Sequence, residues 1–391
     1  MAEVRPFAGL RYDERIAGPL SDLICPPYDV ISADERRRLA ARNERSFVRV
    51  ELPDATAAGY AEAARLLERW RHEGALRADG ASLYLHEHDF TLDGARATRR
   101  GVFVALRLYE ASDGIVLPHE RTFPKAKADR LELLRATRAN TSPIFGMIDG
   151  RAFSTLGGTP GEDAGSATLG GDAHRLRRIT ATAAIERFAE AMRDERVYIA
   201  DGHHRYETAL AYAKEREAAP GAPESFVLTY LCALDDPGLR ILGTHRIVSG
   251  GAAGMDAALR AFDASPIDRA ALGERQPGIV LVRDGVFTRL EPRPDADLSA
   301  LPPAWRALPV AIAEELLLRQ AREAGAEIAY EHDTDRAIDA ARGGRAAVLI
   351  RAVDPATLRS VADAGERLPQ KTTYFYPKVP TGLVIRSLDL G

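Results

Sequence analysis

The sequence predicts an α/β (α+β) fold, and two observations carry this prediction. Segments with helical periodicity alternate with short apolar runs along most of the 391 residues, and hydrophobic residues make up 46% of the chain, as in ordinary globular proteins. A chain of this length exceeds a single ordinary core. We therefore expect one region at 1–218, with a β-rich insertion at about 80–180, and a second α/β region at 219–391.

The N-terminal segment predicts a strand, a turn, a helix and a second strand. Pro26 and Pro27 end a short apolar run, and Ser32 with Glu35 forms a capping box that opens the helix. The run SFVRVEL has strand propensity. An amphipathic helix is expected next, at about 56–73.

The middle of the chain predicts a β-hairpin over about 81–108, with the turn at LDG. A polar helix and another strand follow. The glycine-rich segment 157–173 predicts a loose connection or an exposed hairpin, and a helix is expected near 181–194. His86 and His88 alternate along the first hairpin strand, and we expect them on a polar outer face.

Composition excludes several classes of protein. The formal charge of −4 provides no global basic field for nucleic acid, so nucleic acid is not an expected partner. Cys25 and Cys232 are far apart and make a disulfide framework or a four-cysteine zinc site implausible. With no long apolar run and no signal-like start, we expect a cytoplasmic protein without a membrane partner.

The stretch VYIADGHHRYETALAYAKE at 197–215 predicts a strand, a tight turn and the start of a helix. Free backbone N–H groups and the helix dipole make such a turn an anion site. Around it lie Asp201, Gly202, His203, His204 and Arg205. Phosphate is the expected guest, while metal ligation or a purely structural cap remain alternatives.

Three further clusters carry polar side chains suited to chemistry. His119 and Glu120, with lysines nearby, could act as acid and base or bind magnesium phosphate, or could form a solvated loop. Asn140 and Ser142 could orient a small substrate or cap a helix. Lys371 and Lys378 could bind phosphate or carboxylate, although the aromatic residues between them could simply pack the terminus.

Six motifs, among them PPYDVIS, HERTF, THRIV and QKTTYFYPKVPTGLV, together resemble the prokaryotic family known as domain of unknown function 1015. The DGHHR-x-x-A element is similar to the phosphate-binding motif of the ParB and sulfiredoxin superfamily, and the same DGHHR string occurs in its free-serine kinases. This resemblance implies a ParB/sulfiredoxin-like core that binds ATP, ADP or CTP at the helix start. It also implies an acidic residue after an N-terminal proline, and Asp29 matches that position.

These observations lead to the hypothesis of a nucleotide-dependent phosphotransferase, with magnesium, acting on a small hydroxylated metabolite such as serine. Asp29 or Glu120 would orient the acceptor hydroxyl. Two alternatives remain open: a nucleotide-gated, ParB-like binding protein without turnover, and a metal-dependent hydrolase. The sequence does not predict the oligomeric state.

Overall fold

The computed structural model describes residues 1–119, 124–273, 277–369 and 371–390. The chain forms two compact units. The first comprises Met1–Pro118, Thr122–Leu239 and Pro377–Gly391, and the second comprises His119–Arg121 and Arg240–Tyr376. This division differs from the predicted one at residue 218, because β12 (Phe226–Ala233) belongs to the first unit and the C-terminal segment returns to it.

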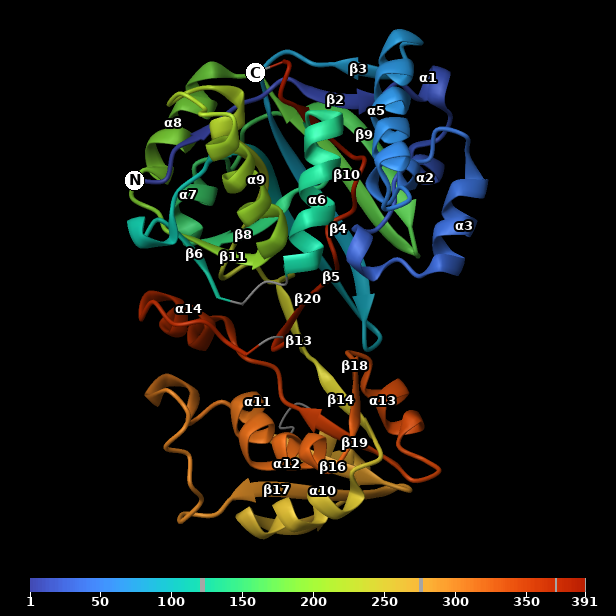
Figure 1. Cartoon of the computed structure of the whole chain (residues 1–391). Helices are drawn as coiled ribbons and strands as arrows, with labels where there is room; N and C mark the ends of the chain where they lie inside the picture. The colour runs from blue at the N-terminus through green and yellow to red at the C-terminus, as the bar shows by residue number, and fades with distance from the viewer. Residues whose placement is uncertain (120–123, 274–276, 370, 391) are drawn as a thin grey trace. The chain divides into compact units, whose positions relative to one another are not determined.

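A mixed β-sheet of nine strands, counted over the described residues, organises the first unit (Figure 1). Its order is β6-β11-β8-β12-β5-β4-β10-β9, with β1 beside β5. The strands are β1 (Val4–Arg5), β4 (Leu83–Leu92), β5 (Ala95–Arg107), β6 (Val116–Pro118), β8 (Ile144–Ile148), β9 (Glu162–Leu169), β10 (Asp172–Ile179) and β11 (Val197–Asp201). The expected insertion thus supplies strands of the main sheet itself.

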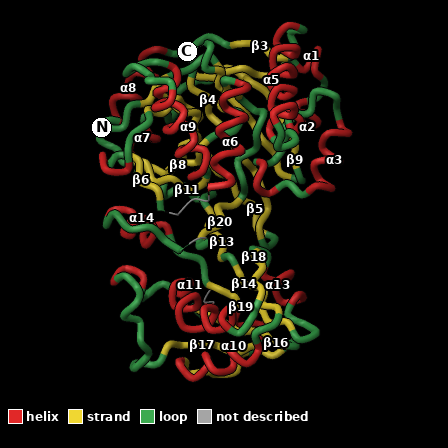
Figure 2. The backbone as a smooth tube through the Cα atoms, in the orientation of Figure 1, coloured by secondary structure: helices red, strands yellow, loops and turns green. Residues whose placement is uncertain are grey.

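The helices of the first unit pack around this sheet and around one another. They are α1 (Glu14–Ala17), α2 (Leu20–Leu23), α3 (Ala33–Arg42), α4 (Val48–Glu51), α5 (Ala57–His72), α6 (Pro124–Thr137), α7 (Gly150–Ser154), α8 (Thr182–Met192) and α9 (His203–Glu215). Helix α6 lies between α5 and α9 and contacts both, as Figure 2 shows. The core combines apolar side chains of β5, β8 and β12 with Phe188 of α8 and Tyr206 of α9.

A second, smaller sheet connects the C-terminal segment to the start of the chain. Its order is β3 (Leu76–Ala78), β2 (Gly9–Tyr12), β21 (Ile385–Ser387) and β7 (Ala139–Asn140). Because β21 pairs with both β2 and β7, residues after Pro377 are fixed within the first unit.

The second unit contains an antiparallel sheet in the order β15-β17-β16-β19-β14-β18 and a two-stranded ribbon, β13-β20. These strands are β13 (Arg240–Gly243), β14 (His245–Ser249), β15 (Phe262–Ile267), β16 (Ile279–Arg283), β17 (Val286–Pro292), β18 (Glu327–Glu331), β19 (Arg345–Ile350) and β20 (Thr373–Tyr376). Its helices include α10 (Ala252–Ala258), α11 (Pro309–Ile312), α12 (Arg319–Glu323), α13 (Thr334–Ala340) and α14 (Pro355–Asp363).

Most of the local expectations are confirmed, and the mixed α/β class is confirmed with them. The hairpin of β4 and β5 turns at Asp93 and Gly94, both with positive φ, and Ser32 accepts a hydrogen bond from Glu35 N at the start of α3. The glycine-rich segment runs into the β9–β10 hairpin. Within the described residues, every helix is too short or too polar to span a lipid bilayer.

Three local expectations are wrong. The apolar run before Pro26 forms helix α2 and, at Cys25, an isolated bridge to Thr381, rather than a strand. The run SFVRVEL forms helix α4 rather than a strand, because burial of Val48, Val50 and Glu51 on one short turn outweighs strand propensity. His86 and His88 do not lie on a polar outer face. Each is 1% exposed, because rings from β5 and β10 pack against them.

Candidate functional site

The strand, turn and helix expected around DGHHR are present in the first unit. Strand β11 ends at Asp201, and Gly202 at φ +87° is the residue that precedes α9. A left-handed φ favours glycine, because a Cβ would crowd the backbone. The turn therefore brings the first N–H groups of a 13-residue helix to the end of a buried strand, which is the geometry of an anion site.

Asp201 holds two cations at this turn. Its Oδ2 accepts from Arg205 Nη2 at 2.7 Å, and its Oδ1 accepts from Lys378 Nζ at 2.6 Å. Burial alone would raise the pKa of Asp201, but Lys378 and then Arg205 outweigh this effect and keep the pKa well below its ordinary value. The carboxylate is thus ionised and fixes both cations.

Arg205 is held against the turn from a second direction as well. Its Nη1 donates to the carbonyl oxygen of Pro143, and its side chain is 10% exposed. A Cβ on Gly202 would lie only 3.0 Å from Arg205 Nε. The guanidinium therefore packs directly on the glycine of the turn.

Asp29 lies in the short turn Tyr28–Val30 and is exposed. Burial raises the pKa of the neighbouring Tyr28 to about 12, and the charge of Arg205 acts in the opposite direction. Burial would lower the pKa of Arg205, but the charge of Asp201 and then that of Asp29 outweigh burial and raise it. The predicted acid and the DGHHR motif therefore lie within electrostatic range of each other.

Arg130 and Glu51 support the turn that carries Asp29. Arg130 of α6 places its guanidinium carbon 4.2 Å from the centre of the Tyr28 ring, and its Nη1 donates to the carbonyl oxygen of Glu51 at 2.8 Å. The Glu51 carboxylate is fully buried and accepts from Tyr28 N at 3.4 Å. We did not expect either residue in the site, because only the fold brings α4 and α6 to this turn.

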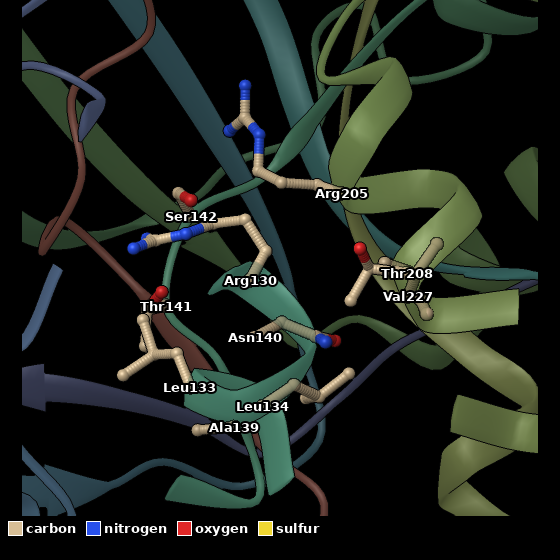
Figure 3. A pocket seen from close by; sticks show the side chains of 11 residues that line it. Arg130, Leu133, Leu134, Ala139, Asn140, Thr141, Ser142, Arg205, Thr208 and Val227 are labelled. Atoms are coloured by element: carbon tan, nitrogen blue, oxygen red, sulfur yellow. The ribbon is translucent and has the colours of Figure 1, made fainter. Parts of the chain in front are cut away.

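A small pocket lies beside Arg205, between α6, α9 and the segment that joins β7 to β8 (Figure 3). Its polar lining comes from Arg130, Asn140, Thr141, Ser142, Arg205 and Thr208, and its apolar lining from Leu133, Leu134, Ala139, Ala209 and Val227. Ser142, a predicted substrate residue, is thus placed next to the anion site. The oxygen of Asn140 is already used, since it accepts from Leu228 N and from Arg386.

The remaining predicted residues have different surroundings. His203 is buried at the start of α9, and His204 is half-buried beside it. His119 and Lys371 belong to the second unit, where His119 is fully buried and contacts Thr373 Oγ1 at 3.1 Å. Glu120 lies outside the described residues. No group of three or more His, Cys, Asp or Glu side chains in the described part of the chain is arranged to hold a metal ion.

Three solved structures are similar to parts of this chain. A free serine kinase in complex with AMP aligns over 74% of this chain and 93% of its own, with 14% identity and a TM-score of 0.39. A conserved hypothetical protein from Pyrococcus furiosus aligns over 74% and 97%, with 14% identity and a TM-score of 0.38. SbnI with a C-terminal truncation, from Staphylococcus aureus, aligns over 73% and 88%, with 11% identity and a TM-score of 0.42.

No curated protein matches the sequence. One protein-family model does match, over residues 4–311, and it therefore covers most of the first structural unit and about half of the second. The chain belongs to the family described as "Protein of unknown function (DUF1015)".

Proposed function

We propose that this chain is a nucleotide-dependent phosphotransferase that transfers phosphate to a small hydroxylated metabolite. The observation that carries the proposal is the turn at Gly202, where α9 begins directly after Asp201 and the two cations that this carboxylate holds, Arg205 and Lys378. Phosphoryl transfer requires mainly positioning and charge neutralisation, and these groups supply both.

The nucleotide phosphates would bind at the start of α9. Arg205 can donate to two phosphate oxygens at once, Lys378 adds a second positive charge, and the N–H groups of the first helical turn point to the same place. Gly202 has no side chain of its own, so a phosphate could approach the backbone beside the Arg205 guanidinium that packs on this glycine. ATP or ADP suits this arrangement, and CTP would present the same phosphates.

Magnesium would arrive with the nucleotide and neutralise part of the phosphate charge. The ion usually keeps several waters and takes one or two protein carboxylates. Asp201 is engaged by two cations, whereas Asp29 is exposed and makes no hydrogen bond to another described residue. Asp29 is therefore the better placed carboxylate, either for the ion or for the hydroxyl of the acceptor.

A thermal-shift panel of ATP, ADP and CTP, with and without magnesium, tests the proposal, because a ligand that binds the native state raises the apparent Tm. We expect a nucleotide-dependent rise in the wild-type protein. Arg205→Ala and His204→Ala should abolish this rise, measured against the Tm of each variant alone. Arg216→Ala, at the exposed end of the same helix, is the control and should retain it.

A flat panel with wild-type protein would refute nucleotide binding. A normal rise in Arg205→Ala would instead show that nucleotides bind somewhere other than the DGHHR turn. Transfer of labelled γ-phosphate from ATP, or of β-phosphate from ADP, to serine would then distinguish a phosphotransferase from a nucleotide-gated binding protein.

A further inference from the structure

We propose that Arg99 is a positioning residue for the phosphate site and that it acts through the C-terminal segment. Arg99 holds the carbonyl group of Pro377, and the next residue, Lys378, reaches Asp201 at the turn before α9. The inference rests on the proposed function and deepens it, since it places one of the two cations of the site under the control of a buried polar cluster on β4, β5 and β10.

Arg99 is a buried cation without a carboxylate partner among the described residues. It is 0% exposed, and its Cζ lies 5.0 Å from the centre of the Phe145 ring and 5.4 Å from that of the Tyr230 ring. Nη1 donates to the carbonyl oxygen of Pro377, whereas Nε has no hydrogen-bond partner in the described part of the chain. An apolar side chain would fill the space between the two rings at a lower desolvation cost, but it could not hold a carbonyl group.

Two anchors flank Lys378 in the segment that returns to the first unit. Pro377 is the first residue of this segment, and its carbonyl group belongs to the peptide unit that leads into Lys378. Further along, Thr381 exchanges backbone hydrogen bonds of 3.2 and 2.8 Å with Cys25. The Lys378 side chain is 12% exposed, and its Nζ lies 2.6 Å from Asp201 Oδ1. Because the peptide unit is planar, the contact at its carbonyl oxygen fixes the direction in which Lys378 starts.

His88 and Asp172 orient the guanidinium through a second contact. Arg99 Nη2 lies 3.4 Å from His88 Nδ1, and His88 Nε2 lies 3.0 Å from Asp172 Oδ2. Burial, followed by the charge of His174, lowers the pKa of His88 well below its ordinary value, so the ring is neutral. An arginine can only donate, so Nδ1 is the acceptor and the proton of the ring is on Nε2, where it faces Asp172.

This tautomer makes the contact with Arg99 sensitive to pH. Burial raises the pKa of Asp172 to about 6. Above this pH the carboxylate can only accept, so His88 presents Nε2–H to it and keeps Nδ1 for Arg99. Below this pH the carboxyl group can donate to Nε2, and the other tautomer would turn an N–H toward the guanidinium. Arg99 should therefore hold the C-terminal segment less firmly below about pH 6.

Other titratable groups act on the same cluster. Burial lowers the pKa of His86 well below its ordinary value and that of His174 to about 4, so both rings are neutral near pH 6. Burial also raises the pKa of Asp236, so a variant of Asp172 is needed to assign a pH effect to Asp172. Among the described residues, the groups around His88, Arg99 and Asp172 are His86 and Asp89 on β4, His174 on β10, Tyr230 and Cys232 on β12, and Asp236 after β12.

The first test measures the position of Lys378 without a nucleotide. Acetic anhydride modifies accessible lysine amines, and mass spectrometry gives the modification of Lys378 relative to that of Lys214, which is 62% exposed, in the same sample. Arg99→Met keeps most of the apolar volume and removes the donors. At pH 8 it should raise the relative modification of Lys378 roughly 3- to 10-fold, which is part of the 10- to 100-fold that a charge-assisted hydrogen bond is worth.

Arg100→Met is the matched control for this test. It is the same substitution at the next residue of β5, whose side chain is 53% exposed and lies 3.3 Å from Glu87. It should leave the modification of Lys378 at the wild-type value. An equal rise in Arg100→Met, or wild-type modification in Arg99→Met, would overturn the proposal.

The second test uses pH and the less buried end of the cluster. The Asp172 side chain is 23% exposed, so Asp172→Asn should fold even if Arg99→Met does not. At pH 7 we expect Asp172→Asn to raise the Kd of ADP roughly 3- to 10-fold over the wild-type protein, and at pH 5 to leave it equal, because the wild-type acid is then also neutral. The ratio of the two Kd values cancels the titration of the nucleotide itself. A ratio that does not change with pH would overturn the connection through His88.

A double-mutant cycle tests whether Arg99 acts through Lys378. Arg99→Met should weaken ADP binding roughly 3- to 10-fold in the wild-type background and should have no further effect in Lys378→Met. Equal weakening in both backgrounds would overturn the proposal. If the modification of Lys378 changes as expected but the wild-type protein binds no nucleotide, the positioning of Lys378 stands and the proposed function fails.

Discussion

Gly202→Ala provides the most direct test of the turn that begins α9. Gly202 has φ +87°, and a Cβ at this position would lie 3.0 Å from Nε and 3.1 Å from Cζ and Nη2 of Arg205. The substitution therefore acts twice. It strains the backbone, and it displaces the guanidinium that we propose binds phosphate.

The two effects have different magnitudes and different readouts. An L-residue with left-handed φ costs about 1–2 kcal/mol, which corresponds to a Tm lower by roughly 2–8 °C for a unit of this size. Displacing Arg205 would weaken a charge-assisted hydrogen bond worth about 1.5–3 kcal/mol, or roughly a 10- to 100-fold loss of nucleotide affinity. Gly202→Val should be worse than Gly202→Ala, because a β-branched side chain needs more space.

Gly94→Ala separates strain from displacement. Gly94 has φ +77° in the β4–β5 turn, and a Cβ there would meet no atom within 4 Å. Both variants should lose Tm, measured by thermal unfolding, but only Gly202→Ala should lose nucleotide affinity, measured by calorimetric titration. Wild-type affinity in Gly202→Ala would refute the close approach of Arg205 and phosphate to this glycine.

Three further predictions follow from the same unit. Lys378→Met should lower the free energy of unfolding by about 1–3 kcal/mol at pH 7, because it leaves a largely buried carboxylate with one cation. Because the pKa of Asp201 is held well below its ordinary value in the native state, this loss should shrink progressively as the pH falls below about 4. Lys127→Met, in a more exposed pair, should cost less than about 1 kcal/mol in the same urea titrations. Asp29→Asn should lower kcat roughly 100-fold or more and keep the Kd of the nucleotide within a few-fold. Glu120→Gln is its control. If steady-state kinetics show the fall in kcat in Glu120→Gln and not in Asp29→Asn, the base is Glu120. Burial lowers the pKa of His174 to about 4, so below pH 6.5 the native state binds fewer protons than the unfolded chain and the protein loses stability on acidification. Between pH 7 and pH 4, the free energy of unfolding of His174→Asn should therefore fall by up to about 3 kcal/mol less than that of the wild-type protein. An equal fall in both proteins would contradict this assignment.

The sequence was sufficient for features that depend on neighbouring residues. The strand, the glycine and the helix of the DGHHR segment follow from local hydrophobicity and from the one residue type that accepts φ +87°. The Ser32 cap and the turn at Asp93 and Gly94 are local in the same sense. These elements could be predicted because their main determinants lie within a few positions of one another.

Features that depend on distant contacts could not be placed in the same way. Lys378 is a candidate because lysines and hydroxyl groups cluster in the C-terminal segment. Its contact with Asp201, 177 positions earlier, depends on the return of that segment through β21. Arg130 is one of several arginines on a polar helix, and nothing in its neighbours marks it as the one that faces Tyr28. Helix α4 shows the same limit, since its buried setting overrides the strand propensity of valine.

The contacts of Asp201 also determine how the site would respond to an anion. Two cations face one carboxylate, so a single positive charge is left for a phosphate, together with the N–H groups of α9. Because Asp201 already fixes the rotamers of Arg205 and Lys378, binding would cost little side-chain entropy. A nucleoside triphosphate carries more negative charge than this arrangement can neutralise. If the proposed function is correct, the balance must come from magnesium, and affinity for ATP should depend on magnesium more strongly than affinity for AMP.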